Sequence, residues 1–240
     1  MRSFGWNQGE RQRLSIGHQT MDRIAFKHLE TKYSQHASWA VWNSHDLEDT
    51  TVIRENPSDL KTSVVMVALN ISKHLPSPWR NFHSRDHARK LMYAFNQSPY
   101  RGAYMTDIIK EYVEPNSLQL QKQLSRGRLE VLPHVEMFRE EMKDLGAKPE
   151  ALFILFGGNV TRVFNKYLSE KFPNRISCTH YSMFGRGFTD AEWVEKVSSI
   201  LESKSQVATT ASEAPAFVVS NKMRAELTRL LSNGLCSRRP

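Results

Sequence analysis

Cysteine is scarce in this chain, and long hydrophobic runs are missing from it. Two cysteines among 240 residues, Cys178 and Cys236, exclude a disulfide framework and any four-cysteine zinc or iron–sulfur site. No stretch approaches about 18 consecutive apolar residues, so no membrane span is expected. Residues 1–20 lack the apolar core of a secretion signal. We therefore expect a cytoplasmic protein with reduced thiols.

Motifs for metal and nucleotide binding are also missing. The nine histidines are scattered and form no His-Glu-x-x-His pair. The chain contains neither a P-loop nor the Gly-x-Gly-x-x-Gly fingerprint of dinucleotide-binding folds, and it has no internal repeat. The sequence thus carries no signal for a metal or a nucleotide cofactor.

What the chain does contain is apolar material for one core and an excess of positive charge. Hydrophobic residues make up 40%, with 12 Phe, 7 Tyr and 5 Trp, which excludes wholesale disorder. The 33 Lys and Arg exceed the 25 Asp and Glu, so the formal net charge is +8. Such a field favours polyanionic partners, nucleic acid first.

Continuous apolar runs alternate with amphipathic segments along the middle of the chain. Strands that are apolar on both faces are typical of a parallel sheet that helices cover on each side. The alternation predicts an α/β fold, a three-layer α/β/α sandwich with a mostly parallel central sheet. We expect strands at residues 63–70, 102–109, 151–158 and 175–180, and helices at 86–96, 132–145, 159–170 and 188–201.

The flanking segments complete the expected organisation. A helix over Met21–Tyr33 is expected to turn Ile24, Phe26 and Leu29 inward. We further expect a short aromatic strand at 38–42, a polar loop at 46–61, a basic N-terminal arm at 1–20, an α/β domain at 21–202, and a linker with a C-terminal helix and tail at 203–240.

Polar residues gather where each predicted strand ends. In an open parallel sheet, ligands bind beyond the carboxyl ends of the strands. The sequence therefore predicts a site at this edge, although any fold places some polar residues there. The candidates are Asn70, Ser72, Lys73 and His74; Thr106, Asp107 and Lys110; Gly157, Gly158 and Asn159; and His180, Tyr181 and Ser182.

Four of these segments, in this order and spacing, resemble the uracil-DNA glycosylase superfamily. They are Val67–Ser72, Tyr104–Lys110, Leu155–Asn159 and Thr179–Ser182, and the resemblance covers about residues 60–200. It implies a three-layer α/β/α fold, a base flipped into a pocket at the strand ends, and no cofactor. It also implies cleavage of an N-glycosidic bond, which needs a positioned water and donors aimed at the departing base.

The resemblance assigns the two catalytic positions to Asn70 and His180. Asn70 matches the water-holding position of the first family motif, and its alternative reading is a turn residue that caps the strand. His180 matches the histidine of the second motif, which donates a hydrogen bond to the base carbonyl as negative charge accumulates. The family usually has proline after this histidine, whereas this chain has Tyr181.

Two departures from the uracil enzymes bear on the base. Asp107 stands where those enzymes usually have asparagine, and an ionised carboxylate accepts hydrogen bonds only, which suits the amine of cytosine. The segment 71–75 lacks the tyrosine that blocks bases substituted at ring carbon five. A structural cap or a salt bridge with Lys110 is the alternative for Asp107.

The remaining candidates would hold the base or the DNA. Phe82 or Trp79 would stack on the base with Ser72 nearby, unless the two aromatics are core residues. Met183 or Phe184 would wedge into the duplex, unless this loop packs on the core. Phosphate contacts are expected from Ser182, Arg80, Arg85, Lys110, Arg162 and Arg186, whose alternative is ordinary surface charge.

Together these patterns predict a monofunctional DNA glycosylase that acts on a 5-substituted cytosine, such as hydroxymethyl- or glucosyl-hydroxymethylcytosine of phage DNA, in anti-phage defence. The alternatives are a uracil-DNA glycosylase of base-excision repair, a non-catalytic DNA-binding relative, and a nucleoside hydrolase. The expected partner is duplex or single-stranded DNA, phage or damaged, and we expect a monomer that does not bind membranes.

Overall fold

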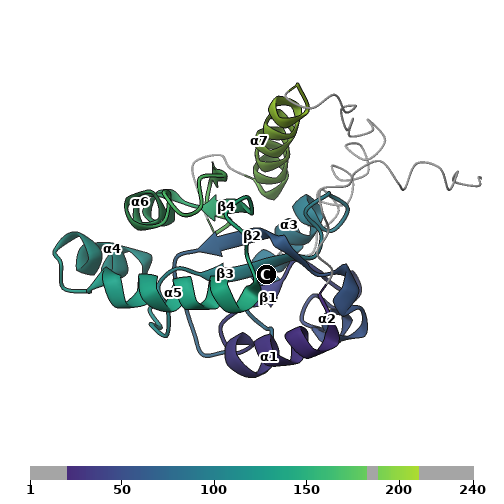
Figure 1. Ribbon diagram of the computed structural model, residues 1–240, viewed down its shortest axis with the longest axis horizontal. Coiled ribbons are helices and arrows are strands. Elements are labelled where there is room, and N and C mark those ends of the chain that lie inside the picture. Colours follow the sequence, from purple (N-terminus) through teal and green to yellow (C-terminus); the bar gives the residue numbers. More distant parts are fainter. Residues whose placement is uncertain (1–20, 183–188, 211–240) are drawn as a thin grey trace, which may run out of the picture.

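The computed structural model describes residues 21–182 and 189–210, with the side chains of residues 85, 86 and 204–210 left aside. Its centre is a five-stranded sheet in the order β1-β3-β2-β4-β5 (Figure 1). Strand β1 pairs antiparallel with β3, and all other pairs are parallel. The predicted mostly parallel sheet is confirmed. The strands are β1 (Ser38–Trp39), β2 (Lys61–Ala68), β3 (Ala103–Asp107), β4 (Leu152–Phe156) and β5 (Arg175–Cys178).

Helices cover both faces of the sheet, an arrangement compatible with a three-layer sandwich (Figure 1). One core lies between the sheet and α1, α5 and α6, and the other between the sheet and α3 and α7. No helix among the described residues is long and apolar enough to cross a membrane. The helices are α1 (Arg23–Tyr33), α2 (Thr51–Glu55), a 3-10 turn (Pro57–Asp59), α3 (Arg85–Phe95), α4 (Ser117–Ser125), α5 (Val131–Leu145), α6 (Gly158–Tyr167) and α7 (Asp190–Thr210).

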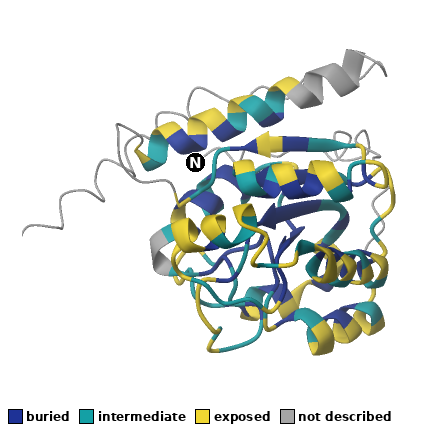
Figure 2. Ribbon diagram, turned by 90° about the vertical axis from the view of Figure 1, so that its left-hand side faces the viewer, coloured by how far each residue is buried: buried dark blue, intermediate teal, exposed yellow. Residues whose placement is uncertain are grey.

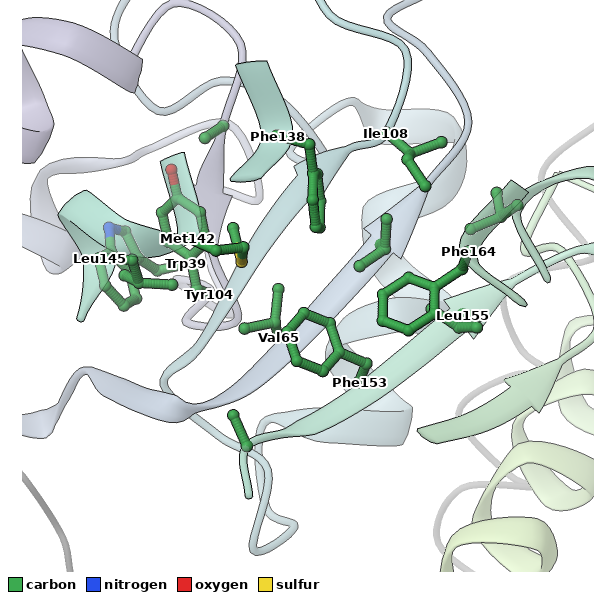
Figure 3. Close-up of a cluster of buried hydrophobic side chains, with 14 of the residues drawn as sticks. Trp39, Val65, Tyr104, Ile108, Phe138, Met142, Leu145, Phe153, Leu155 and Phe164 are labelled. Atoms are coloured by element: carbon green, nitrogen blue, oxygen red, sulfur yellow. The ribbon is translucent and has the colours of Figure 1, made fainter. Parts of the chain in front are cut away.

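Alternating strand side chains supply both cores. Phe153 of β4 points to the α5 side, where its ring centroid lies 5.0 Å from that of Phe164 (Figure 3). Ile154 points to the α3 and α7 side. The strands are accordingly buried along most of their length, while the helices expose their outward faces (Figure 2). This two-sided burial explains why the strand sequences are apolar without interruption.

The connections place a topological switch point at the carboxyl edge. From β2 the chain passes through α3 to β3 on one side, and it then returns through α4 and α5 to β4 on the other side of β2. Loops that leave β2 and β4 therefore diverge to opposite faces of the sheet. In open α/β sheets this is where ligands bind.

Several sequence expectations need correction. Ile24 was expected to face inward, but its exposed fraction is 85% because only Phe26 and Leu29 lie on the inner stripe of α1. The polar loop at 46–61 contains α2 and the 3-10 turn, and α4 was not anticipated. Helix α7 continues to Thr210, so the linker expected from Ser203 is helical over 203–210. The arm at 1–20 and the segment from 211 onward lie outside the described residues.

Candidate active site at the carboxyl edge of the sheet

The four parallel strands end at one edge, as the sequence predicted. The register pairs Ala68 of β2 with Asp107 of β3 and Phe156 of β4 with Cys178 of β5. Asn70 and His180 follow β2 and β5, and β4 lies between these strands. Two strand spacings correspond to about 10 Å. The two predicted catalytic residues thus lie on the same edge but do not touch each other directly.

The side-chain amide of Asn70 is fixed by hydrogen bonds to backbone carbonyl groups. Its Nδ2 donates to the carbonyl oxygens of Ile71 at 2.8 Å and Glu114 at 3.0 Å, and more weakly to that of Tyr112 at 3.4 Å. Carbonyl oxygens only accept, so nitrogen is the amide atom that faces them. The side chain therefore joins the loop after β2 to the loop after β3. It leaves Oδ1 as an acceptor with no partner among the described residues.

His180 is a neutral imidazole with one defined tautomer. Burial lowers its pKa to about 4, and the nearby charges of His87 and Lys90 act in the same direction. Its Nδ1 accepts from the backbone N–H of Ser182 at 3.1 Å and lies 2.7 Å from the Ser182 hydroxyl oxygen. A neutral ring that accepts at Nδ1 carries its proton on Nε2. His180 is thereby set as a hydrogen-bond donor through Nε2.

Gly157 leaves the space that the His180 side chain occupies. This residue follows β4 and has a φ of 98°, a backbone conformation that residues other than glycine rarely adopt. A Cβ at this position would lie 3.3 Å from the Cβ of His180. The backbone of the β4–α6 turn therefore packs directly against His180, and a Cβ at position 157 would require His180 to shift by a few tenths of an ångström.

Asp107 is the most unusual group at this edge. Its exposed fraction is 3%, and burial raises the pKa of its carboxyl group to about 7. Its Oδ2 accepts from Nδ2 of Asn81 at 2.7 Å, whereas its buried Oδ1 has no hydrogen-bond partner among the described residues. Near neutral pH the group is therefore divided between an ionised and a protonated form, which the sequence did not predict.

The loop at 79–82 crosses the edge of the sheet over Asp107. Trp79 packs into the core on the α1 side, and Phe82 packs into the core on the α3 side. Both have positive φ, 62° and 64°, which is uncommon for aromatic residues. Asn81 lies between them and also donates from Nδ2 to the carbonyl oxygen of His36 at 2.9 Å. The crossing places an amide beside the Asp107 carboxyl group.

Tyr181 covers the same side of the edge. Its ring stacks on His180 at 4.3 Å between centroids and meets the edge of Phe82 at 5.8 Å. The negative charge of Asp107 contributes to raising the Tyr181 pKa well above its ordinary value, after burial, which is the larger cause. Phe82, Tyr181 and His180 therefore form one cluster of rings, and Asp107 lies near enough for its charge to act on Tyr181. Phe82 is 6% exposed and contacts Tyr181, so it forms part of the wall under this ring.

Two predicted ligand contacts are wrong because the residues are buried elsewhere. Trp79 is fully buried on the α1 side, where its Nε1 donates to Glu30 at 3.2 Å, so it cannot stack on a base near His180. Lys110 is 4% exposed and forms an ion pair with Glu141 while donating to Thr106 at 2.6 Å. A lysine held in this way is not available to DNA phosphates.

The other predicted contacts divide into three groups. Ser72 and Ser182 are exposed on the loops after β2 and β5. Arg80 is paired with Glu48 at 3.1 Å, and Arg162 donates to Asn159 at 3.0 Å while remaining exposed. The side chain of Arg85 and the residues Met183, Phe184 and Arg186 lie outside the described part of the chain.

Asn81 escaped the sequence reasoning. It lies in the loop at 79–82 between β2 and α3, for which the sequence indicated no polar site residue besides Arg80, and it is 26 positions from its partner Asp107. The hydrophobic periodicity of the sequence cannot predict such a contact, because it arises from the path of the loop over the sheet edge. Among the described residues, no group of three His, Cys, Asp or Glu is placed to hold a metal ion.

Comparisons of the chain with protein-family models, with curated proteins and with solved structures find no match.

Proposed function

We propose that this protein is a DNA glycosylase of the uracil-DNA glycosylase type, with its active site at the carboxyl edge of the sheet. The observation that carries the proposal is the neutral imidazole of His180, whose Nδ1 is occupied by Ser182 and whose Nε2 is left to donate. A fixed neutral donor suits a leaving base whose carbonyl oxygen gains negative charge as the glycosidic bond breaks.

The reaction divides between two residues. The bond from the sugar C1′ to the base nitrogen breaks, and its electron pair leaves with the base. The Nε2–H of His180 stabilises the resulting anion. Oδ1 of Asn70, which no described residue occupies, accepts a hydrogen bond from the water whose oxygen then bonds to C1′. The water proton ends on solvent or on the departing base, so no cofactor is required.

Asp107 selects the base in this proposal. Its ionised form accepts from the exocyclic amine of cytosine, and the loop after β2 has no tyrosine to exclude a group at ring carbon five. We favour a 5-substituted cytosine, such as the hydroxymethyl or glucosylated forms of phage DNA, and hence a role in defence. Its protonated form donates instead, which suits uracil and supports the repair function as the second candidate.

The test is a panel of otherwise identical DNA duplexes and single strands. These carry uracil, cytosine, hydroxymethylcytosine or glucosylated hydroxymethylcytosine, and abasic sites are measured by alkaline cleavage. We expect abasic sites with a substituted cytosine and about 100-fold slower formation in His180→Gln, since one oxyanion donor is typically worth that much. Release of uracil alone would assign the repair function.

Two matched variants separate catalysis from folding. His28 is an exposed histidine on α1, and Asn174 donates to a backbone carbonyl at 3.2 Å just before β5, at the opposite edge. His28→Gln and Asn174→Ala should retain full activity, whereas Asn70→Ala should lose it. Binding of DNA by the wild-type protein without abasic sites from any substrate would indicate a non-catalytic relative and would end the proposal.

A further inference from the structure

We propose that Asn81 is the positioning residue for base selection: it holds one oxygen of Asp107, so that the other oxygen reads the exocyclic amine of the base. This inference rests on the proposed glycosylase function and names a specificity determinant within it. It assigns a role to a residue in the loop that precedes α3, outside all four segments that carry the family resemblance.

Both ends of the Asn81 side-chain amide are engaged. Nδ2 donates to the carbonyl oxygen of His36 and to Oδ2 of Asp107, and Oδ1 accepts from the backbone N–H of Phe82 at 3.1 Å. The amide therefore has one orientation, with nitrogen toward Asp107. The carboxyl group is held by one oxygen in a nearly dry environment. Its second oxygen has no partner there.

A buried polar atom without a partner is rare, because it forgoes the hydrogen bond it would make in water. An amine N–H of a bound base would supply that hydrogen bond. The charged and titratable groups that act on Asp107 do not replace it. Lys110 is already paired with Glu141, so its positive charge is largely compensated, and the Tyr181 hydroxyl group stays protonated.

The backbone around Asn81 is fixed at some cost. Trp79 and Phe82 both adopt left-handed conformations, which persist only where surrounding contacts impose them. Trp79 N–H donates to the Ser34 carbonyl at 2.6 Å, and the Trp79 carbonyl accepts from the Ser38 hydroxyl at 2.7 Å. These bonds anchor the Trp79 end of the loop to the end of α1 and to β1. They keep the Asn81 amide in register with Asp107.

The orientation of Asn81 gives a sharp test with three variants, Asp107→Asn, Asn81→Leu and the double variant. In Asp107→Asn, the Asn81 N–H attracts the new amide oxygen, so the new amide nitrogen faces the base. Preference should invert from the cytosine type to uracil by about tenfold or more. In the double variant nothing orients the new amide, and the inverted preference should be lost.

The single variant Asn81→Leu has a different signature. A carboxylate offers oxygen on both sides, so the preference for cytosine-type bases should persist. The hydrogen bond that favours the ionised form is lost, however, so the acid limb of the pH–rate profile should move from about pH 7 upward by about one unit. Asn96→Leu is the matched control, because Asn96 bonds to Trp42 at the end of α3 and should leave preference and pH profile unchanged.

Two outcomes overturn the inference: a double variant that keeps the inverted preference, or an acid limb that Asn81→Leu does not move.

Should the wild type release no base at all, carbon-13 NMR of labelled Asp107 still tests the positioning role. Titration of the carboxyl signal in wild type and Asn81→Leu, with and without free cytosine or uracil, tests the same contact. An upward pKa shift in the variant and a response to cytosine alone would support the positioning role while the glycosylase proposal fails. An unchanged Asp107 pKa in Asn81→Leu would overturn the positioning role of Asn81.

Discussion

Asp107 and His180 lie at the same edge of the sheet, and burial shifts their pKa values in opposite directions. Withdrawal from water disfavours the charged form of each group. The Asp107 pKa therefore rises to about 7, and the His180 pKa falls to about 4. At neutral pH this edge of the sheet thus holds an uncharged imidazole donor after β5 and, at the end of β3, a carboxyl group that can both accept and donate. Under the proposed function, burial would thus prepare His180 for the base carbonyl and Asp107 for the Watson–Crick edge by the same physical cause.

This burial has a measurable cost in stability. The folded protein retains the Asp107 proton up to about pH 7, whereas an ordinary aspartate releases it near 3.8. Folding therefore takes up a proton between these values, and the contribution of Asp107 to stability falls as pH rises through that window. Relative to wild type, Asp107→Asn should gain up to about 4 kcal/mol between pH 4 and pH 8. Urea unfolding at several pH values measures this, and a difference independent of pH would contradict it.

At the scale of elements, the sequence predicted what local patterns determine. The apolar run at 63–70 and its three counterparts identified the parallel strands, and the order of strands and helices identified the edge where Asp107 and His180 lie. The two-residue strand β1 lies within the short aromatic strand predicted at 38–42, whereas helix α4 was not anticipated. Asn81 was missed entirely, since its contact with Asp107 arises from the fold of the whole sheet edge.

The turn between β4 and α6 provides the prediction at this scale. Gly157→Ala adds a Cβ 3.3 Å from the Cβ of His180 and requires a strained φ. We expect the unfolding free energy to fall by about 1–3 kcal/mol. We also expect glycosylase activity to fall further than in the control variant, because His180 must move. Gly146→Ala at the end of α5 is the matched control. It has a similar φ of 72° but nothing within 4 Å, so it should lose stability without a specific loss of activity. Equal activity losses would contradict the role of the turn.

For the molecule as a whole, positive charge is unevenly distributed along the sequence. Nine of the 33 Lys and Arg but only three of the 25 Asp and Glu lie in residues 1–20, 183–188 and 211–240, which leaves 24 cations against 22 anions in the described part. Within that part, Lys110 and Arg80 are already paired with acidic residues. The described part alone is therefore nearly neutral, and under the proposed function we expect attraction to DNA phosphates to depend on the other segments.

Neutralising charges in the full chain tests this distribution. Log affinity for duplex DNA falls with log salt by about 0.9 for each phosphate contact. Replacing Arg11, Arg13, Arg238 and Arg239 by Gln should therefore reduce this slope by up to about 3 to 4 and weaken binding at low salt, as measured by fluorescence anisotropy. The matched control replaces the exposed Lys143, Lys148, Lys166 and Lys171 near the opposite edge of the sheet. Because both variants remove four positive charges, an equal fall in slope would show that net charge alone, and not its place in the chain, governs DNA binding.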